Sequence, residues 1–294
     1  MNHIITDYTY LQNTIWHLKA KFPFLRVKTI GKSVVGRSIY ALEIGRENTP
    51  TVVLAGTLWG TDHLSGRSLL QFVEAFLQAL CSKRHICGVD PVAVLRNRKI
   101  AVIPFVNPDG REICARGAHC GGIDSGKIRR LCGGNTKTWD ANARGVEIPR
   151  NFDYRFEERQ KREQNRGIYG PAPKGFGGSS PACEPETKAI ADYCVSQTLL
   201  HGCALYPGKG EVFWRNAKDD PQKSEPVARL LALTAGYDLE ADVGSIVDTG
   251  FKNYLNNQTG RPAFDVMIPH MESERFFREQ YPVLEDLLLT ACIV

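Results

Sequence analysis

The stretch that decides the fold is Thr51–Leu70, which reads Thr-Val-Val-Leu-Ala-Gly-Thr-Leu-Trp-Gly-Thr-Asp-His-Leu-Ser-Gly-Arg-Ser-Leu-Leu. β-Branched and apolar residues over Thr51–Ala55, bounded by Gly56, predict a buried strand. A helix is expected to begin near Asp62 or His63, because the apolar residues that follow recur at helical spacing: Leu64, Leu69, Phe72, Val73, Phe76 and Leu77. Side chains at such a strand-to-helix turn lie over the C-terminal edge of a sheet, where open α/β folds bind their ligands.

The rest of the chain also alternates helices and strands. Apolar spacing predicts an amphipathic helix at Tyr8–Phe22, and period-two alternation on both sides of Val34–Arg37 predicts a hairpin over Val27–Gly45. The Gly- and Cys-rich segment Arg111–Asp140 has no clear period, so we expect a long surface loop there. The remaining signals are a strand at Lys99–Val106, a helix from Glu184 to Val195, a strand at Leu199–Tyr206, and helices at Ser224–Thr234 and Glu279–Thr290.

Composition is that of a globular protein, with 43% hydrophobic and 23% charged residues and a net charge of +5. No apolar run is long enough to span a membrane, and no basic stripe or Cys/His finger indicates nucleic-acid binding. The N-terminus lacks a secretory signal pattern, and nine scattered Cys fit reduced thiols, so we expect a cytoplasmic protein. Basic residues outnumber acidic ones over Arg111–Arg166, which fits either a cationic rim for an anionic ligand or an ordinary solvated surface.

The turn after the first buried strand resembles that of the zinc carboxypeptidase family, which reads Gly-x-x-His-x-x-Glu. Further segments resemble the family along nearly the whole chain: Gly31–Ile39, Asn107–Gly110, Arg144–Phe152, Glu184–Thr187 and Arg261–Pro269. The segment Leu131–Gly145 is most similar to the bacterial γ-D-glutamyl-diaminopimelate endopeptidases. The resemblance implies one α/β domain over residues 1–294, with a central mixed, mostly parallel twisted sheet and helices on both faces.

The resemblance also implies functional positions, and four of them carry unexpected residues. The family's three zinc ligands fall on Trp59, Asp62 and Pro207, and its general base falls on Met267. The family's Asn-Arg pair, which clamps the substrate carboxylate, falls on Pro149 and an arginine that is retained. The substrate-binding residues that the resemblance leaves in place are Arg150, Arg144 and Asn107.

These replacements have a common physical explanation. A catalytic zinc needs about three protein ligands and an open site for water, whereas Trp59 offers only an indole N–H and Pro207 offers nothing. Without the metal, clustered imidazoles and carboxylates would be buried polar groups that lack partners. Bulky apolar side chains are therefore favoured at these positions. We therefore expect Trp59 and Met267 to fill the vacated space and Asp62 to cap the following helix. The resulting hypothesis is a protein without metal cofactor or peptidase activity, which retains a cleft for a peptide or another carboxylate-bearing ligand.

Two enzymatic alternatives stay open. A displaced zinc site using Asp62, His63 and His270 would give a working metallocarboxypeptidase or cell-wall-peptide endopeptidase. A metal-free hydrolase is the other, although no Gly-x-Ser-x-Gly motif occurs in the chain. A metal knuckle built from His119 with Cys114, Cys120 and Cys132 matches no zinc spacing pattern.

Overall fold

One mixed sheet carries the strands of the computed structural model, which describes residues 5–215, 221–241 and 250–294. Within these ranges the sheet has eight strands in the order β1-β2-β4-β3-β5-β8-β6-β7. Strands β4, β3, β5 and β8 are mutually parallel, and β2 and β6 join them antiparallel. At the two edges, β1 pairs antiparallel with β2, and β7 pairs parallel with β6. The predicted fold class is therefore confirmed. The strands are β1 (Arg26–Lys32), β2 (Ser38–Gly45), β3 (Thr51–Ala55), β4 (Lys99–Ile103), β5 (Leu199–Gly208), β6 (Glu211–Phe213), β7 (Asp238–Glu240) and β8 (Ala263–Pro269).

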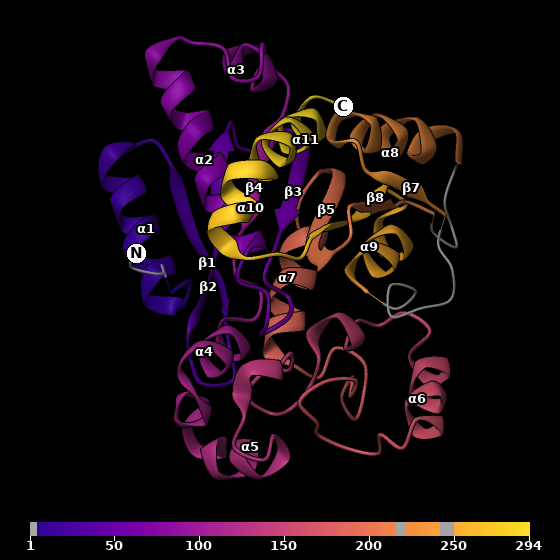
Figure 1. Ribbon diagram of the computed structural model, residues 1–294. Helices are drawn as coiled ribbons and strands as arrows, with labels where there is room; N and C mark the ends of the chain where they lie inside the picture. Colours follow the sequence, from indigo (N-terminus) through magenta and orange to yellow (C-terminus); the bar gives the residue numbers. More distant parts are fainter. Residues whose placement is uncertain (1–4, 216–220, 242–249) are drawn as a thin grey trace.

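Helices cover both faces of this sheet (Figure 1), because the central strands are apolar on both sides. In β3, Val52 and Leu54 belong to one core cluster, whereas Val53 and Ala55 belong to the other. The first cluster includes α1 (Tyr8–Lys21), α2 (Ser65–Ser82), α8 (Pro221–Ala235), α10 (Ser273–Glu279) and α11 (Tyr281–Ile293). The second includes α7 (Pro185–Val195) and α9 (Phe251–Thr259).

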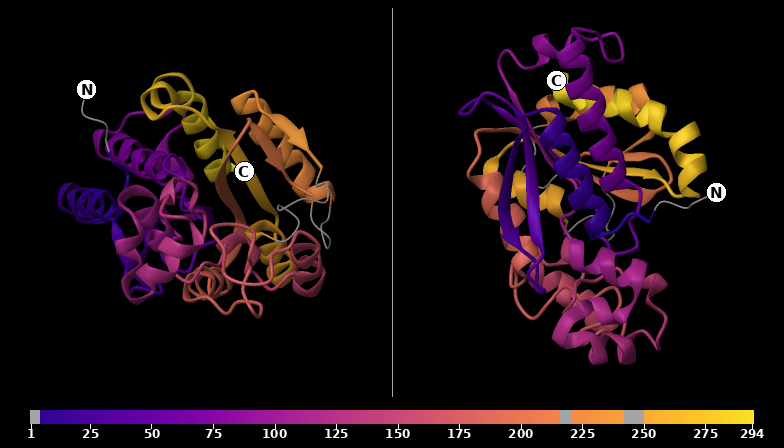
Figure 2. Two further views of the ribbon diagram at one scale, coloured as in Figure 1. Left: turned by 60° about the horizontal axis from the view of Figure 1, so that its bottom comes forward. Right: turned by 90° about the vertical axis from the view of Figure 1, so that its left-hand side faces the viewer.

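The expectation of a surface loop over Arg111–Asp140 is wrong. The segment holds short helices, which gather with α6 at the bottom of Figure 1 and of the right-hand view of Figure 2. Ile113, Ile128 and Trp139 form a separate small core between them. A core of distant residues in short, Gly-interrupted helices leaves no period in the sequence. The elements are α4 (Pro108–Arg116), η1 (Ala118–Asp124), α5 (Ser125–Leu131), η2 (Thr136–Thr138), η3 (Ile148–Arg150) and α6 (Phe156–Asn165).

Other predicted elements are confirmed with shifted ends. Helix α2 begins at Ser65, and the strand predicted from Lys99 ends at Ile103. The predicted C-terminal helix is α11, and the helix α10 that precedes it was not predicted. The short helix α3 (Pro91–Val94) was not predicted. In the described part of the chain, the helices are all too short or too polar to cross a bilayer.

Candidate functional site

The loop between β3 and α2 holds Asp62, whose side chain is completely buried. Its carboxylate accepts backbone N–H groups from Thr57 at 3.2 Å, Leu64 at 3.1 Å and Ser65 at 3.0 Å. Burial raises the pKa of Asp62, and the donors at Ser65 and Leu64 oppose that rise. Ser65 is the first residue of α2, so this carboxylate satisfies amides at the helix N-terminus, as predicted for a capping residue.

Trp59 lies in the same loop, and its indole is held from two sides. The Nε1–H donates to Glu147 Oε1 at 2.9 Å, and the ring packs against Tyr206 with centroids 5.1 Å apart. A metal-bound histidine commonly donates its distal ring N–H to a carboxylate in the same way. Glu147 therefore gives position 59 a carboxylate partner, but here the donor is an indole that cannot bind a metal.

Pro207 and Met267 lie on the neighbouring parallel strands β5 and β8. Met267 pairs in register with Tyr206, and Pro207 pairs with Ile268. Met267 and Trp59 are both half-buried and pack against the same hydrophobic cluster, which contains Tyr206. The four family positions thus meet at the C-terminal edge of β3, β5 and β8.

The residues at these positions do not fit the zinc that the resemblance implies. Trp59 donates its only polar hydrogen to Glu147, Pro207 has no donor atom, and the Asp62 carboxylate is already engaged by three amides. The rings of His63 and His270 lie 6.2 Å apart, centroid to centroid. Across the residues described, no three His, Cys, Asp or Glu side chains form a group that could hold a metal ion.

The predicted substrate-binding residues are engaged elsewhere in the protein. Arg150 is buried, with Nε 3.3 Å from Glu147 Oε2 and Nη1 3.8 Å from Glu163 Oε1. Asn107 is also buried; its amide accepts from Gly110 N and donates to backbone carbonyls, and its side chain begins α4. Arg144 is half-exposed, 3.5 Å from a carboxylate oxygen of Glu184. None of the three lines the pocket described next, so their role in ligand binding stays a prediction.

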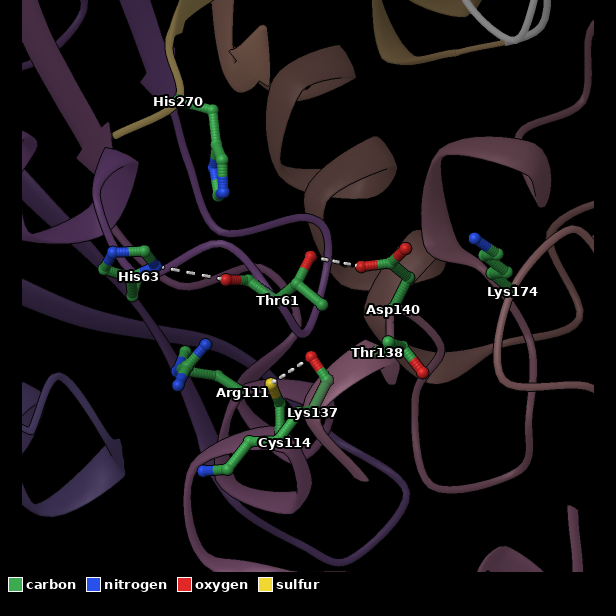
Figure 3. A pocket seen from close by; sticks show the side chains of 9 residues that line it. All are labelled: Thr61, His63, Arg111, Cys114, Lys137, Thr138, Asp140, Lys174 and His270. Atoms are coloured by element: carbon green, nitrogen blue, oxygen red, sulfur yellow. Dashed lines mark hydrogen bonds between the residues drawn. The ribbon is translucent and has the colours of Figure 1, made fainter. Parts of the chain in front are cut away.

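A pocket of about 450 Å³ lies beside this loop (Figure 3). Figure 3 shows His63 and His270 on one side of the space and Asp140 and Lys174 on the other. Sequence reasoning missed most of this set, and the only signal for it was the excess of basic residues after Arg111. The lining residues are Thr61, His63, Arg111, Cys114, Lys137, Thr138, Asp140, Lys174 and His270.

Close backbone contacts join the segments around the pocket. Gly60 N donates to Asp140 O at 3.0 Å, and a Cβ at Gly60 would lie only 2.3 Å from the carbonyl oxygen of Trp139. Arg111 donates to Gly60 O at 2.6 Å and to Thr6 O at 2.9 Å. The β3–α2 loop, α4 and the segment after η2 are therefore fixed against one another, and glycine is required at the contact.

The ionisable groups of the pocket have shifted pKa values. Burial raises the pKa of Asp140 to about 6; the nearby Glu147 carboxylate adds to this rise, and a hydrogen bond from the Thr61 hydroxyl opposes it. Burial lowers the pKa of His63, although the charge of Asp62 acts in the opposite direction. The pocket therefore combines cationic side chains with one carboxyl group that titrates near neutrality.

Comparison with known proteins identifies relatives of this chain among peptidases. Among curated proteins, γ-D-glutamyl-L-diamino acid endopeptidase 1 of Lysinibacillus sphaericus is 24% identical over 262 residues, covering 88% of this chain and 64% of that protein. The chain spans less than two thirds of the length of the curated relatives that it matches.

Solved structures share the fold. Carboxypeptidase A from Helicoverpa armigera superposes with a TM-score of 0.71 at 16% identity, covering 98% of this chain and 74% of that one. Murein-tripeptide amidase from Escherichia coli O157 superposes with a TM-score of 0.54 at 18% identity, covering 90% of this chain and 91% of that one. The zinc carboxypeptidase profile matches residues 11–260. Since this match spans most of the sequence, the chain belongs to the zinc carboxypeptidase family.

Proposed function

We propose that this protein is a non-catalytic member of its family, which holds no catalytic zinc, cleaves no peptide and uses its cleft to bind a peptide or another carboxylate-bearing ligand. The observation that carries the proposal is the hydrogen bond from Trp59 Nε1 to Glu147, which commits position 59 to an N–H donor. The engaged carboxylate of Asp62 and the absence of any donor atom at Pro207 support it. With Met267 at the general-base position, no carboxylate is available there to activate water.

A second candidate function rests on the names of the relatives. The Lysinibacillus relative is named as an endopeptidase of γ-D-glutamyl-L-diamino acid bonds, and one structural neighbour as a murein-tripeptide amidase. In this alternative, the chain is a metallopeptidase acting on cell-wall-type peptides with a non-standard zinc site. We also propose a cytoplasmic location, because all nine cysteines are free, as expected in a reducing compartment.

Metal content separates the two candidates. We expect protein purified without chelators to contain far less than one zinc per chain by mass spectrometry of the metal. We also expect no hydrolysis of a γ-D-glutamyl-diamino acid peptide, with or without added zinc. A content of about one zinc per chain, together with activity that Asp62→Ala abolishes, would establish the alternative instead. A relative with its ligands intact serves as the positive control for both assays.

A further inference from the structure

Five nitrogen-bearing side chains converge on the 450 Å³ pocket from separate segments of the chain. His63 comes from the β3–α2 loop, Arg111 from α4, and Lys137 from η2. Lys174 comes from the loop before α7, and His270 follows β8. Figure 3 shows them around one space, although the chain separates the first from the last by most of its length.

Within the described residues, the permanent cations of the pocket form no salt bridges, although the charge of Lys174 acts on Asp140. In the described residues, neither the Nζ of Lys137 nor that of Lys174 forms an ion pair or a hydrogen bond. Arg111 is buried and is held by Nε and Nη1 on the carbonyl oxygens of Thr6 and Gly60. That anchoring fixes the guanidinium plane, and within the described residues Arg111 forms no salt bridge. Repulsion among convergent, unpaired cations disfavours the pocket unless an anion is bound.

Among the described residues that line the pocket, Asp140 alone carries a carboxyl group, and it accepts the Thr61 hydroxyl. One carboxylate opposite the three permanent charges of Arg111, Lys137 and Lys174 leaves an excess of two positive charges. A single carboxylate ligand would compensate only half of that excess, whereas one dianionic group compensates all of it. A guanidinium edge and two ammonium groups also suit the several oxygens of a phosphate.

We propose that this pocket binds the phosphate group of a small phosphorylated molecule, with Arg111, Lys137 and Lys174 as its charged ligands. The volume suits a small molecule, since ligand pockets span about 300–1,000 Å³. The hydroxyl of Thr138 is a further hydrogen-bond donor. Because these residues lie outside the four family metal positions, the proposal does not depend on whether zinc binds.

Calorimetric titration of the full chain with inorganic phosphate tests the proposal, with succinate as the dicarboxylate comparison at constant ionic strength. We expect saturable phosphate binding that is at least about tenfold tighter than succinate binding. The double variant Lys137→Gln/Lys174→Gln should weaken phosphate binding by at least about tenfold. Both lysines are exposed, so the variant is expected to fold, which an unchanged melting temperature verifies.

Lys188→Gln is the matched control, because it removes an exposed lysine of α7 that does not line this pocket. Its phosphate affinity should equal that of the wild type. Any of three results overturns the proposal: no saturable phosphate binding, equal weakening in the control and double variants, or succinate binding as tightly as phosphate. The metal content is measured on the same preparations. A failure of the proposed zinc-free function is thereby distinguished from a failure of phosphate binding.

Discussion

Glu147 connects the altered metal position to the interior of the protein. Its two oxygens accept the Trp59 indole N–H and the Gly175 amide, and one lies 3.3 Å from Arg150. If the carboxylate is removed, Trp59 and Gly175 lose a hydrogen-bond acceptor, and Arg150 loses an ion-pair partner while it stays buried. A buried charge without its partner is costly, so this residue supports the present structure whether or not a ligand binds.

Glu147→Ala is therefore expected to reduce the free energy of unfolding by about 3 kcal/mol or more. Urea denaturation followed by circular dichroism measures the change. Glu158→Gln is the control, because that carboxylate forms a solvent-exposed pair with Arg155 and its loss should leave the free energy of unfolding nearly unchanged. Equal losses in the two variants would contradict the structural role given to Glu147.

Asp140 makes anion binding depend on pH. Its carboxyl, with a pKa of about 6, lies among Thr61, Lys174 and Glu147, and the pocket also contains His63 and His270. Protonation removes a negative charge from the pocket, so affinity for an anion rises as pH falls. Sulfate is the suitable probe, because it remains a dianion throughout this range.

We expect sulfate to bind about three- to tenfold more tightly near pH 5 than near pH 8, measured by calorimetry. Asp140→Asn should bind sulfate more tightly near pH 8 and lose most of this dependence. If that variant retains the wild-type pH profile, Asp140 is not the group whose protonation controls sulfate binding.

At the scale of elements, a buried acidic cluster joins the β1–β2 turn, α4 and α7. Glu186 in α7 accepts Val34 N and the amide of Asn142, both at 3.1 Å, and it lies near Asp109. Asp109 in turn accepts the Ser33 hydroxyl and pairs with Arg37. Burial raises the pKa of Glu186 to about 8, and repulsion from Asp109 contributes.

This junction predicts a stability that falls as pH rises. Between about pH 5 and about pH 8, the folded protein retains a proton on Glu186 that the unfolded chain releases. The free energy of unfolding therefore falls as pH rises through this range, by about 1.4 kcal/mol for each unit of pKa shift. Glu186→Gln should flatten this part of the curve of unfolding free energy against pH. Glu74→Gln, an exposed change in α2, should leave the curve unaltered. Identical curves for all three proteins would show that Glu186 is ionised in the folded state.

Elements with a strong apolar period were predictable, and those fixed by tertiary contacts were not. Helix α2 and strand β3 carry their own patterns, so the prediction erred only in where the helix begins. Helices α4 and α5 are short, and Ile113, Ile128 and Trp139 stabilise them only once the chain has folded. For the same reason the pocket was missed, because its lysines come from segments that local patterns describe as loops.

At the scale of the whole molecule, the family fold is retained while the residues at the four family metal and general-base positions differ from the family pattern. The match to Helicoverpa carboxypeptidase A covers 98% of this chain. The four altered positions lie at one edge of the sheet, where β3, β5 and β8 end. Their partners were not predictable, because Glu147 meets Trp59 only through a contact between distant segments.

Restoring the family ligands tests whether the scaffold still supports a metal. We expect the quadruple variant Trp59→His, Asp62→Glu, Pro207→His and Met267→Glu to bind about one zinc per chain in equilibrium dialysis. Glu147 is already placed to accept a ring N–H from position 59. Trp59→His alone should bind none tightly. A folded quadruple variant without zinc would mean that the surrounding backbone has moved away from coordination distance.

The ring contact between Trp59 and Tyr206 also gives the protein an internal optical reporter. At a centroid separation of 5.1 Å, excitation of the phenol passes efficiently to the indole, whose emission responds to the polarity around it. Of the other tryptophans, Trp139 and Trp214 are buried, and Trp16 is half-exposed on α1. Fluorescence that Trp59→Phe removes would therefore report changes around this loop without any attached dye.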